Sequence, residues 1–95
     1  SVDLTVLKAP EEIELMKKLS EYPEEIRISA QTLEPSRLTR YVLDVASNFH
    51  SFYNACRVKG EEENLMYARM ILVDSTRLVI KNVLDVLSIT APEKM

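Results

Sequence analysis

The residues best able to do chemistry fall in one stretch, which runs from Pro35 to Val58. It holds the single histidine of the chain, His50, and its single cysteine, Cys56. Such a pair can bind a metal ion, or form a nucleophile in which the imidazole activates the thiol. Here the two residues are six positions apart, which places them on different sides of a helix, and neither has a further ligand at a usual spacing. The sequence therefore predicts no catalytic residue and no metal site.

The same stretch carries an uninterrupted apolar seam. Its members follow one another at alternating steps of four and three residues, which is the spacing of one face of an α-helix. The seam consists of Leu38, Val42, Val45, Phe49, Phe52 and Cys56. The pattern predicts one long helix, in which Cys56 continues the apolar stripe and belongs to the core.

Two borders flank this apolar face when the helix is plotted at about 100° per residue. They consist of Arg37, Tyr41 and Asn48 on one side and of Ala46, His50, Tyr53 and Arg57 on the other. Each border combines a ring, a cation and a polar donor, and such sets can stack on unpaired bases and hold phosphates. They can equally be boundary positions, where tyrosine keeps its hydroxyl in water and arginine covers apolar surface. The pattern alone favours this second interpretation.

Prolines and acids divide the rest of the chain into helices. Pro10, Pro23 and Pro35 each stand where a helix would begin, and glutamates that suit the positive end of a helix dipole follow the first two. Gly60, the only glycine, falls where a left-handed helix cap is wanted. We expect an all-α fold, an antiparallel bundle of about four helices, two short and then two long. The predicted ranges are 10–22, 23–33, 35–57 and 62–88.

The short helices have simple apolar faces. Their expected buried positions are Ile13, Met16 and Leu19, with Leu15 beside them, in the first helix, and Ile26, Ala30 and Leu33 in the second. These faces recur at helical spacing, so each short helix is expected to bury one side.

The fourth helix contains two polar residues, Arg69 and Thr76, inside its apolar seam. The seam positions are Leu65, Arg69, Leu72, Thr76, Val79, Val83 and Val86. The Thr76 hydroxyl can donate to a carbonyl one turn earlier. A guanidinium that faces a core must find a carboxylate, carbonyls or solvent. We interpret Arg69 as structural, an arginine that reaches water or pairs with an acid of a neighbouring helix, in preference to a ligand-binding residue.

Composition sets broad limits. Ninety-five residues make one domain, and a single cysteine cannot form an intrachain disulfide. Residues 35–60 carry four basic side chains against one acid, within a chain of net charge −3, and so small a cluster is more typical of a solvated face than of a nucleic-acid footprint. No apolar run approaches the roughly 20 residues that span a bilayer, and no signal peptide is visible. We expect a cytoplasmic protein without membrane contact, and the absence of an initial Met favours a fragment.

The run from Tyr41 to Val58 resembles the long helix in the C-terminal anticodon-binding domain, of the DALR type, of arginyl-tRNA synthetases. That helix typically reads Y-L-x-x-L-A-x-x-F-x-x-F-Y-x-x-C-x-V, and here the sequence is YVLDVASNFHSFYNACRV. The similarity continues through residues 68–70 and 79–82 and ends at PEKM, where family members commonly finish with P-E-R-M. The FHSFYN run together with this ending is specific; cysteinyl and bacterial glycyl enzymes share the domain type but lack both signatures.

The resemblance covers nearly the whole chain, with two departures. Val83 and Ser88 stand where the family often has glycine, and the first of these is expected to alter close helix packing. The resemblance also implies that residues 1–95 are the C-terminal part of the anticodon-binding domain, without the helix that usually opens it and without the catalytic domain and its HIGH-type motif.

The parent enzyme implied by the resemblance is an aminoacyl-tRNA ligase that joins arginine to its tRNA using ATP and Mg²⁺. The fragment alone is expected to be non-catalytic and to hold no cofactor. Its implied partners are arginine-specific tRNA and the catalytic domain of the parent chain. Because the opening helix is missing, part of an apolar face would be exposed, so self-association of the fragment is also expected.

With the resemblance in view, both borders of the long helix become candidates for the RNA-facing surface. The candidate RNA-binding residues are Arg37, Tyr41, Asn48, His50, Tyr53, Arg57 and Met95. The residues assigned to the core are Phe49, Phe52, Leu72 and Leu84. The resemblance also implies that the neighbouring helix with which Arg69 pairs is the second or third. One alternative from another class stays open, namely a helical-bundle domain that binds protein and makes no contact with RNA.

Overall fold

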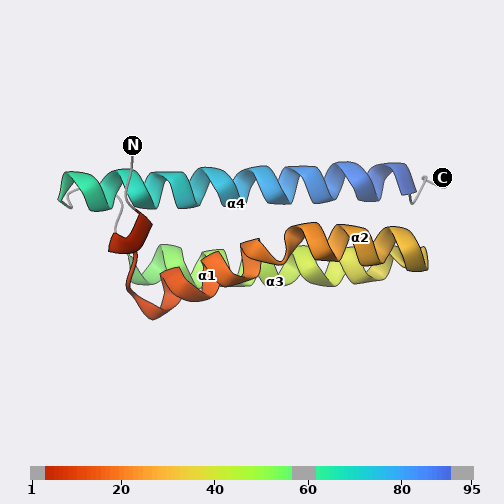
Figure 1. Ribbon diagram of the computed structural model, residues 1–95, viewed down its shortest axis with the longest axis horizontal. Helices are drawn as coiled ribbons and strands as arrows, with labels where there is room; N and C mark the ends of the chain where they lie inside the picture. Colours follow the sequence, from red (N-terminus) through yellow and green to blue (C-terminus); the bar gives the residue numbers. More distant parts are fainter. Residues whose placement is uncertain (1–3, 57–61, 91–95) are drawn as a thin grey trace.

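Helices account for all the secondary structure in the computed structural model, which describes residues 4–56 and 62–90. The elements are the short 3-10 helix η1 (Leu4–Val6) and four α-helices, α1 (Pro10–Ser20), α2 (Tyr22–Thr32), α3 (Pro35–Ala55) and α4 (Glu63–Thr90). Helix α3 runs back along α1 and α2, and α4 runs opposite to α3 (Figure 1). The predicted all-α class, with two short helices before two long ones, is therefore confirmed. Gly60, the predicted cap, lies outside the described residues.

Helices α1 and α2 are nearly one bent helix. Only Glu21 separates them, and its backbone is itself α-helical, with φ −82° and ψ −7°. The backbone N–H of Glu25 donates to the Glu21 carbonyl at 3.0 Å, so the ladder resumes at once. Pro23 has no N–H with which to continue the ladder and restricts the residue before it. The bundle thus has four helices when the bend is counted as a break and three when it is not.

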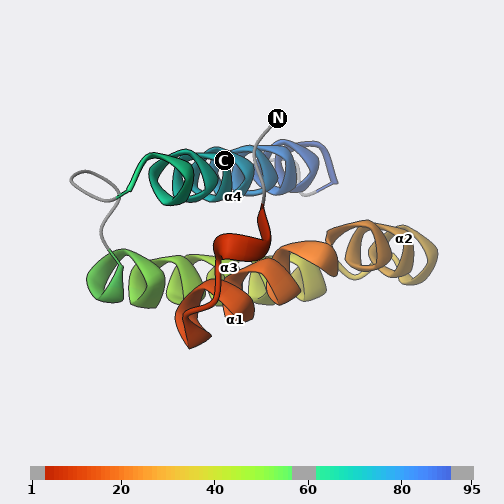
Figure 2. The same cartoon turned by 60° about the vertical axis from the view of Figure 1, so that its left-hand side comes forward.

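Helix α3 is central, since it contacts α1, α2 and α4. Figures 1 and 2 show α1 and α2 along one side of α3 and α4 along another. Two apolar clusters lie along α3, and their buried residues are Leu7, Leu15, Phe52, Cys56, Ala68 and Leu72 in one, and Leu38, Tyr41, Val42, Val45 and Val83 in the other. The predicted seam is confirmed, because every member is buried except Phe49, which is half-buried and packs against the first cluster.

The buried face of α1 is rotated from the prediction. Leu15, which was placed beside the buried stripe, is fully buried, whereas Ile13 is 47 % exposed. Glu12 is buried as well, because its carboxylate meets the guanidinium of Arg69 from α4. A helix can present only one face to the core, so bringing Glu12 and Leu15 inward turns Ile13 out.

The prediction of burial was wrong at three further positions. Ala30 and Leu33 are exposed, and Leu84, assigned to the core, is 51 % exposed. Helix α2 ends at Thr32, and Leu33 caps it in the left-handed conformation with φ 58°, so its side chain leaves the helical face. On α4 the core side is occupied by the fully buried Val83, and Leu84 lies about 100° further round the helix.

Arg69 and Glu12 form an ion pair where α4 crosses the start of α1. Arg69 Nε donates to Glu12 Oε2, and the other carboxylate oxygen accepts a hydrogen bond from the Ala9 backbone N–H at 3.0 Å. Arg69 does pair with an acid of a neighbouring helix, but that helix is α1 and not the second or third. The prediction for Thr76 is also confirmed, since its hydroxyl donates to the Leu72 carbonyl at 2.8 Å.

Replacing Arg69 by methionine (Arg69→Met) should lower the free energy of unfolding by about 3–5 kcal/mol, because the Glu12 carboxylate would stay buried without its charge partner. Urea unfolding followed by circular dichroism measures the loss. The matched control is Arg77→Met, which breaks a pair with Asp74 that is mostly exposed and should cost no more than about 1 kcal/mol. Similar small losses in both variants would contradict the structural role of the buried pair.

Candidate nucleic-acid interface

Two residues of the first border of α3, Tyr41 and Arg37, make contacts with the short helices. The Tyr41 ring is only 4 % exposed, and its hydroxyl donates to the Lys18 carbonyl of α1 at 2.6 Å. Arg37 Nε and one terminal nitrogen donate to the two carboxylate oxygens of Glu25, at 2.8 and 3.2 Å. A ring packed in this way cannot stack on a base, so the assignment of Tyr41 to RNA binding is corrected. Arg37 is held against α2 by a two-pronged ion pair.

Charges on this side of the molecule cancel. A shallow polar depression is lined by Lys18, Glu21, Glu25, Arg37, Arg40, Tyr41 and Asp44. Within it Lys18 Nζ lies 3.3 Å from a Glu21 oxygen and 3.8 Å from an Asp44 oxygen. Three cations thus face three carboxylates, and the depression has no surplus positive charge with which to attract phosphate.

Asn48 lies beside acids as well. It is half-buried, and with Ser51 it borders a hollow whose other walls are Pro10, Glu11 and Glu14 at the start of α1. The two carboxylates would repel a nucleic-acid backbone that approached Asn48. On the first border Tyr41 is thus buried, Arg37 is paired with Glu25, and Asn48 lies beside two carboxylates.

The second border of α3 is open. Tyr53 is 64 % exposed, yet its ring stacks on Phe49 with centroids 6.0 Å apart and planes at 30°. Phe49 in turn meets the fully buried Phe52, with centroids 5.9 Å apart. The Tyr53 ring is thus backed by a chain of rings that leads into the core. It presents its free face on a support that is already ordered.

His50 is the second exposed candidate on this border, and it has a partner that the sequence reasoning missed. Asn54 Nδ2 lies 3.1 Å from His50 Nε2. A spacing of four residues on a helix could have signalled this contact. We call His50, Tyr53 and Asn54 the recognition edge. Arg57 and Met95, the remaining candidates, lie outside the described residues.

The recognition edge belongs to a stretch without acids. The sequence has no Asp or Glu between Asp44 and Glu61, so the C-terminal half of α3 carries no carboxylate. A neutral surface with a supported ring suits an unpaired base better than it suits a phosphate. Among the described residues no cluster of His, Cys, Asp or Glu could hold a metal ion.

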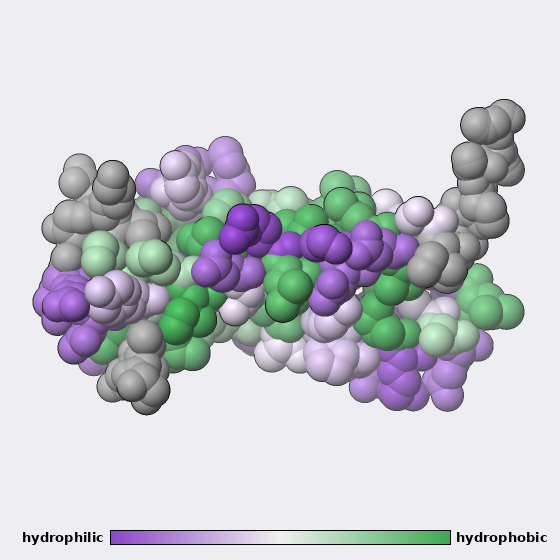
Figure 3. Space-filling view, turned by 90° about the horizontal axis from the view of Figure 1, so that it is seen from above, coloured by the Kyte–Doolittle hydropathy of each residue, from purple (hydrophilic) through white to green (hydrophobic). Residues whose placement is uncertain are grey.

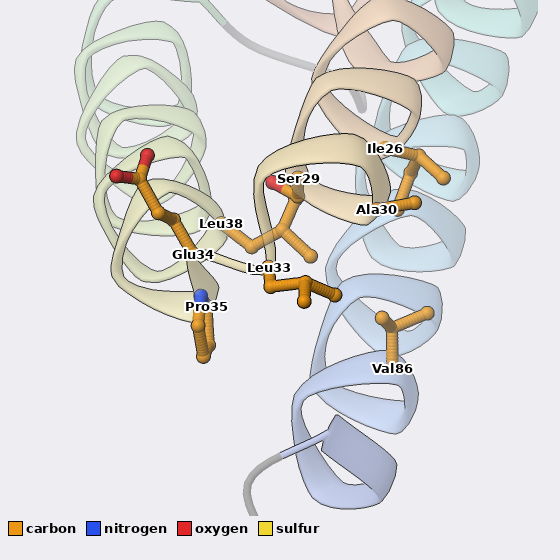
Figure 4. Close-up of a pocket in the computed structure, with 8 residues that line it drawn as sticks. All are labelled: Ile26, Ser29, Ala30, Leu33, Glu34, Pro35, Leu38 and Val86. Atoms are coloured by element: carbon orange, nitrogen blue, oxygen red, sulfur yellow. The ribbon is translucent and has the colours of Figure 1, made fainter.

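An apolar pocket opens elsewhere, where α2 ends beside α4 (Figure 4). It is lined by Ile26, Ser29, Ala30, Leu33, Glu34, Pro35, Leu38 and Val86. A second apolar hollow, between η1, α1 and α4, is lined by Leu4, Leu7, Met16, Leu19, Ser20, Ile71, Leu72, Ser75 and Val79. We call the two together the apolar groove. Figure 3, which looks onto α4, shows apolar side chains among charged ones on this helix, so α4 is only partly covered.

The comparisons with known proteins agree with this architecture. Residues 1–95 match the family model of the DALR anticodon binding domain. The chain belongs to this family. The domain is 73 % identical over 95 residues to an arginine–tRNA ligase of Ruminiclostridium cellulolyticum, and 62 % identical over 94 residues to one of Caldanaerobacter subterraneus. These matches cover 100 % and 99 % of the chain but 17 % of each relative. No solved structure matches the domain.

A ligase of Desulfitobacterium hafniense is also similar, with 54 % identity over 93 residues, which is 98 % of the chain and again 17 % of the relative. The domain therefore spans about a sixth of the length of these relatives. In the part of the domain that the structure describes, no helix is both long and apolar enough to cross a membrane.

Burial of Tyr41 predicts a loss of stability in alkali. Desolvation, followed by the charges of Glu21 and Glu25, raises the pKa of the phenol above its ordinary value. The folded protein then keeps a proton that the unfolded chain releases above about pH 10, so the free energy of unfolding falls as the pH rises through that range. Tyr41→Phe should remove this part of the slope, measured by urea unfolding at several alkaline pH values. Identical slopes in the two proteins would contradict it.

Proposed function

We propose that this domain recognises the anticodon stem-loop of arginine-specific tRNA as part of an arginine–tRNA ligase. The observation that carries the proposal is the family match over all 95 residues, to an anticodon-binding domain. It is supported by relatives that are named arginine–tRNA ligases and are up to 73 % identical. The recognition edge on α3 supplies a physical route for the contact.

The recognition edge would meet the loop of the RNA. An anticodon loop presents splayed bases, and proteins read such bases by stacking aromatic rings on them and by bonding to their edges. Tyr53 offers a ring that is exposed on one side and supported on the other by Phe49. One stacked base contributes roughly 1–3 kcal/mol of binding free energy.

The rest of the activity would lie in the remainder of the parent chain. The domain covers 17 % of its relatives, so attachment of arginine, together with the ATP and Mg²⁺ that the reaction uses, is assigned to the parts outside these residues. We place the parent enzyme in the cytoplasm, where its tRNA substrate is used for protein synthesis. The catalytic domain of the parent is then the second partner of this domain, besides tRNA.

The apolar groove is a surface on which another part of the parent chain would pack. It is lined by apolar residues of α1, α2 and α4, and the large apolar side chains of α4 that remain exposed are Tyr67, Met70, Ile71, Leu78 and Leu84. Apolar area of this kind is buried in complete proteins far more often than it is left in water. In the domain alone it offers a route to self-association.

Tyr53→Ala should weaken the binding of arginine tRNA to the complete ligase by about 1–3 kcal/mol, because a stacked base would lose its ring. Helix content, measured by circular dichroism, should not change, since Tyr53 lies outside the core. Filter binding or fluorescence titration measures the affinity. The matched control is Leu43→Ala, which removes an exposed apolar side chain from the same helix, away from the groove, and should leave RNA affinity unaltered.

Added salt separates RNA binding from a protein–protein function in the same titration. Affinity for RNA should fall steeply as salt rises, because the release of counterions from the RNA becomes less favourable in concentrated salt. Arginine tRNA that binds neither tightly nor in a salt-dependent way, in wild-type and Tyr53→Ala proteins alike, would refute the proposed function. Loss of helix content in step with affinity would instead remove Tyr53 from the interface.

The isolated 95-residue domain should self-associate at high concentration through the apolar groove and the exposed face of α4. Sedimentation velocity over a concentration series measures this, and Leu78→Glu, which puts a charge on an apolar position that is 58 % exposed, should shift the domain toward monomer. Leu43→Glu is the matched control, because Leu43 is 63 % exposed on α3, away from the groove. A domain that is monomeric throughout would contradict this expectation.

A further inference from the structure

His50 and Asn54 restrict each other's chemistry on the recognition edge. Their side chains meet through Asn54 Nδ2 and His50 Nε2, 3.1 Å apart. With the amide nitrogen turned toward the ring, as in this contact, Asn54 donates and Nε2 accepts, and an accepting ring nitrogen carries no proton. In a neutral imidazole the bond made by one ring nitrogen decides the state of the other. The ring proton of His50 is then on Nδ1.

We propose that Asn54 is a positioning residue that holds His50 in its Nδ1–H form, so that His50 offers one neutral hydrogen-bond donor to an acceptor on an unpaired RNA base. The inference rests on the proposed function, because it names the chemistry by which the same edge meets its RNA. Neutral imidazole is otherwise free to carry the proton on either nitrogen. The contact with Asn54 selects the Nδ1–H tautomer in the protein without bound RNA.

The surroundings of His50 favour a base over a phosphate as the acceptor. His50 and Tyr53 are three positions apart on α3, which makes them neighbours on the helix surface. A base stacked on the Tyr53 ring therefore has a donor beside its edge. A neutral N–H group gains little from the charge of a phosphate. Base edges carry both acceptor and donor atoms, and one well-placed N–H donor binds only the nitrogen and oxygen acceptors among them.

The tautomer can be measured directly, because His50 is the only histidine of the chain. Long-range ¹H–¹⁵N spectra of the labelled protein in mildly alkaline solution should show the proton on Nδ1. Asn54→Ala should shift the ring toward the Nε2–H form. Asn54→Asp, whose carboxylate can only accept, should place the proton on Nε2. The matched control, Asn64→Ala, removes an exposed amide from α4 and should leave the spectrum unchanged.

An Nε2 proton in the wild-type protein, or identical spectra for wild type and Asn54→Ala, would overturn the positioning role of Asn54. These measurements need no RNA, so they decide the inference separately from the proposed function. That function fails by a different result, arginine tRNA that binds the complete ligase neither tightly nor in a salt-dependent way.

Titration with an anticodon stem-loop tests the donor role in the complete ligase. His50→Ala should weaken binding about two- to tenfold, the effect of one lost neutral hydrogen bond. The slope of affinity against salt should stay the same, because no phosphate contact is removed. Asn54→Ala should cause a smaller loss in the same direction. A slope reduced by about one in His50→Ala would overturn the base assignment, since it would mark His50 as a cationic phosphate contact.

Discussion

Burial of one face of α3 along its 21 residues is the constraint on which the rest of the domain depends. The seam meets α1 and α2 on one side and α4 on another (Figure 2), so the helix cannot turn about its axis without exposing core residues. Moving Phe52 alone into water would cost about 1.5–3 kcal/mol. Because the rotation is fixed, so is the environment of every other side chain on α3. Tyr41 is carried into the core and Tyr53 out of it, although both flank the same seam.

Charge divides α3 into two halves with different uses. In the first half, basic residues lie beside the acids of α1 and α2, as in the pair between Arg37 and Glu25. The positive charge of these basic residues is balanced within the protein. In the second half no carboxylate follows Asp44 on the helix. A domain with a net charge of −3 thereby keeps one surface that does not repel RNA. The acids of the short helices therefore neutralise the basic residues in the first half of α3, and the recognition edge lies in the half without acids.

Helical spacing explains both what could be predicted from the sequence and what could not. Spacing fixes which residues share a face, and so the α3 seam, the four helical segments and the bond of Thr76 were predicted correctly. It does not fix how a face is turned toward its neighbours. Ile13 and Leu15 exchanged places for that reason, because tertiary contacts, among them the pairing of Glu12 with Arg69, set the rotation of α1.

The candidate site was harder to predict than the fold. Whether a residue on the border of α3 is buried or exposed depends on which neighbouring helix packs against it, and helical spacing does not show this. Tyr41 and Tyr53 carry the same ring beside the same seam. The sequence does not reveal that the Tyr41 hydroxyl donates a hydrogen bond to the Lys18 carbonyl. Leu33 and Leu84 failed as core residues for a related reason. One follows a helix end in the left-handed conformation, and the other lies next to the residue that actually fills the core, Val83.

The two open surfaces of the domain share no residue, and this separation has a mechanical consequence. The recognition edge is built from α3 alone, whereas the apolar groove is lined by η1, α1, α2, α4 and the first residues of α3. A segment of the parent chain packed in the groove would clamp α4 to the short helices and leave Tyr53 uncovered. It would also support the buried side of α3, since both core clusters contain residues of α3 and of α4. Under the proposed function, the parent chain and the RNA would therefore contact separate surfaces, with the buried seam of α3 between them.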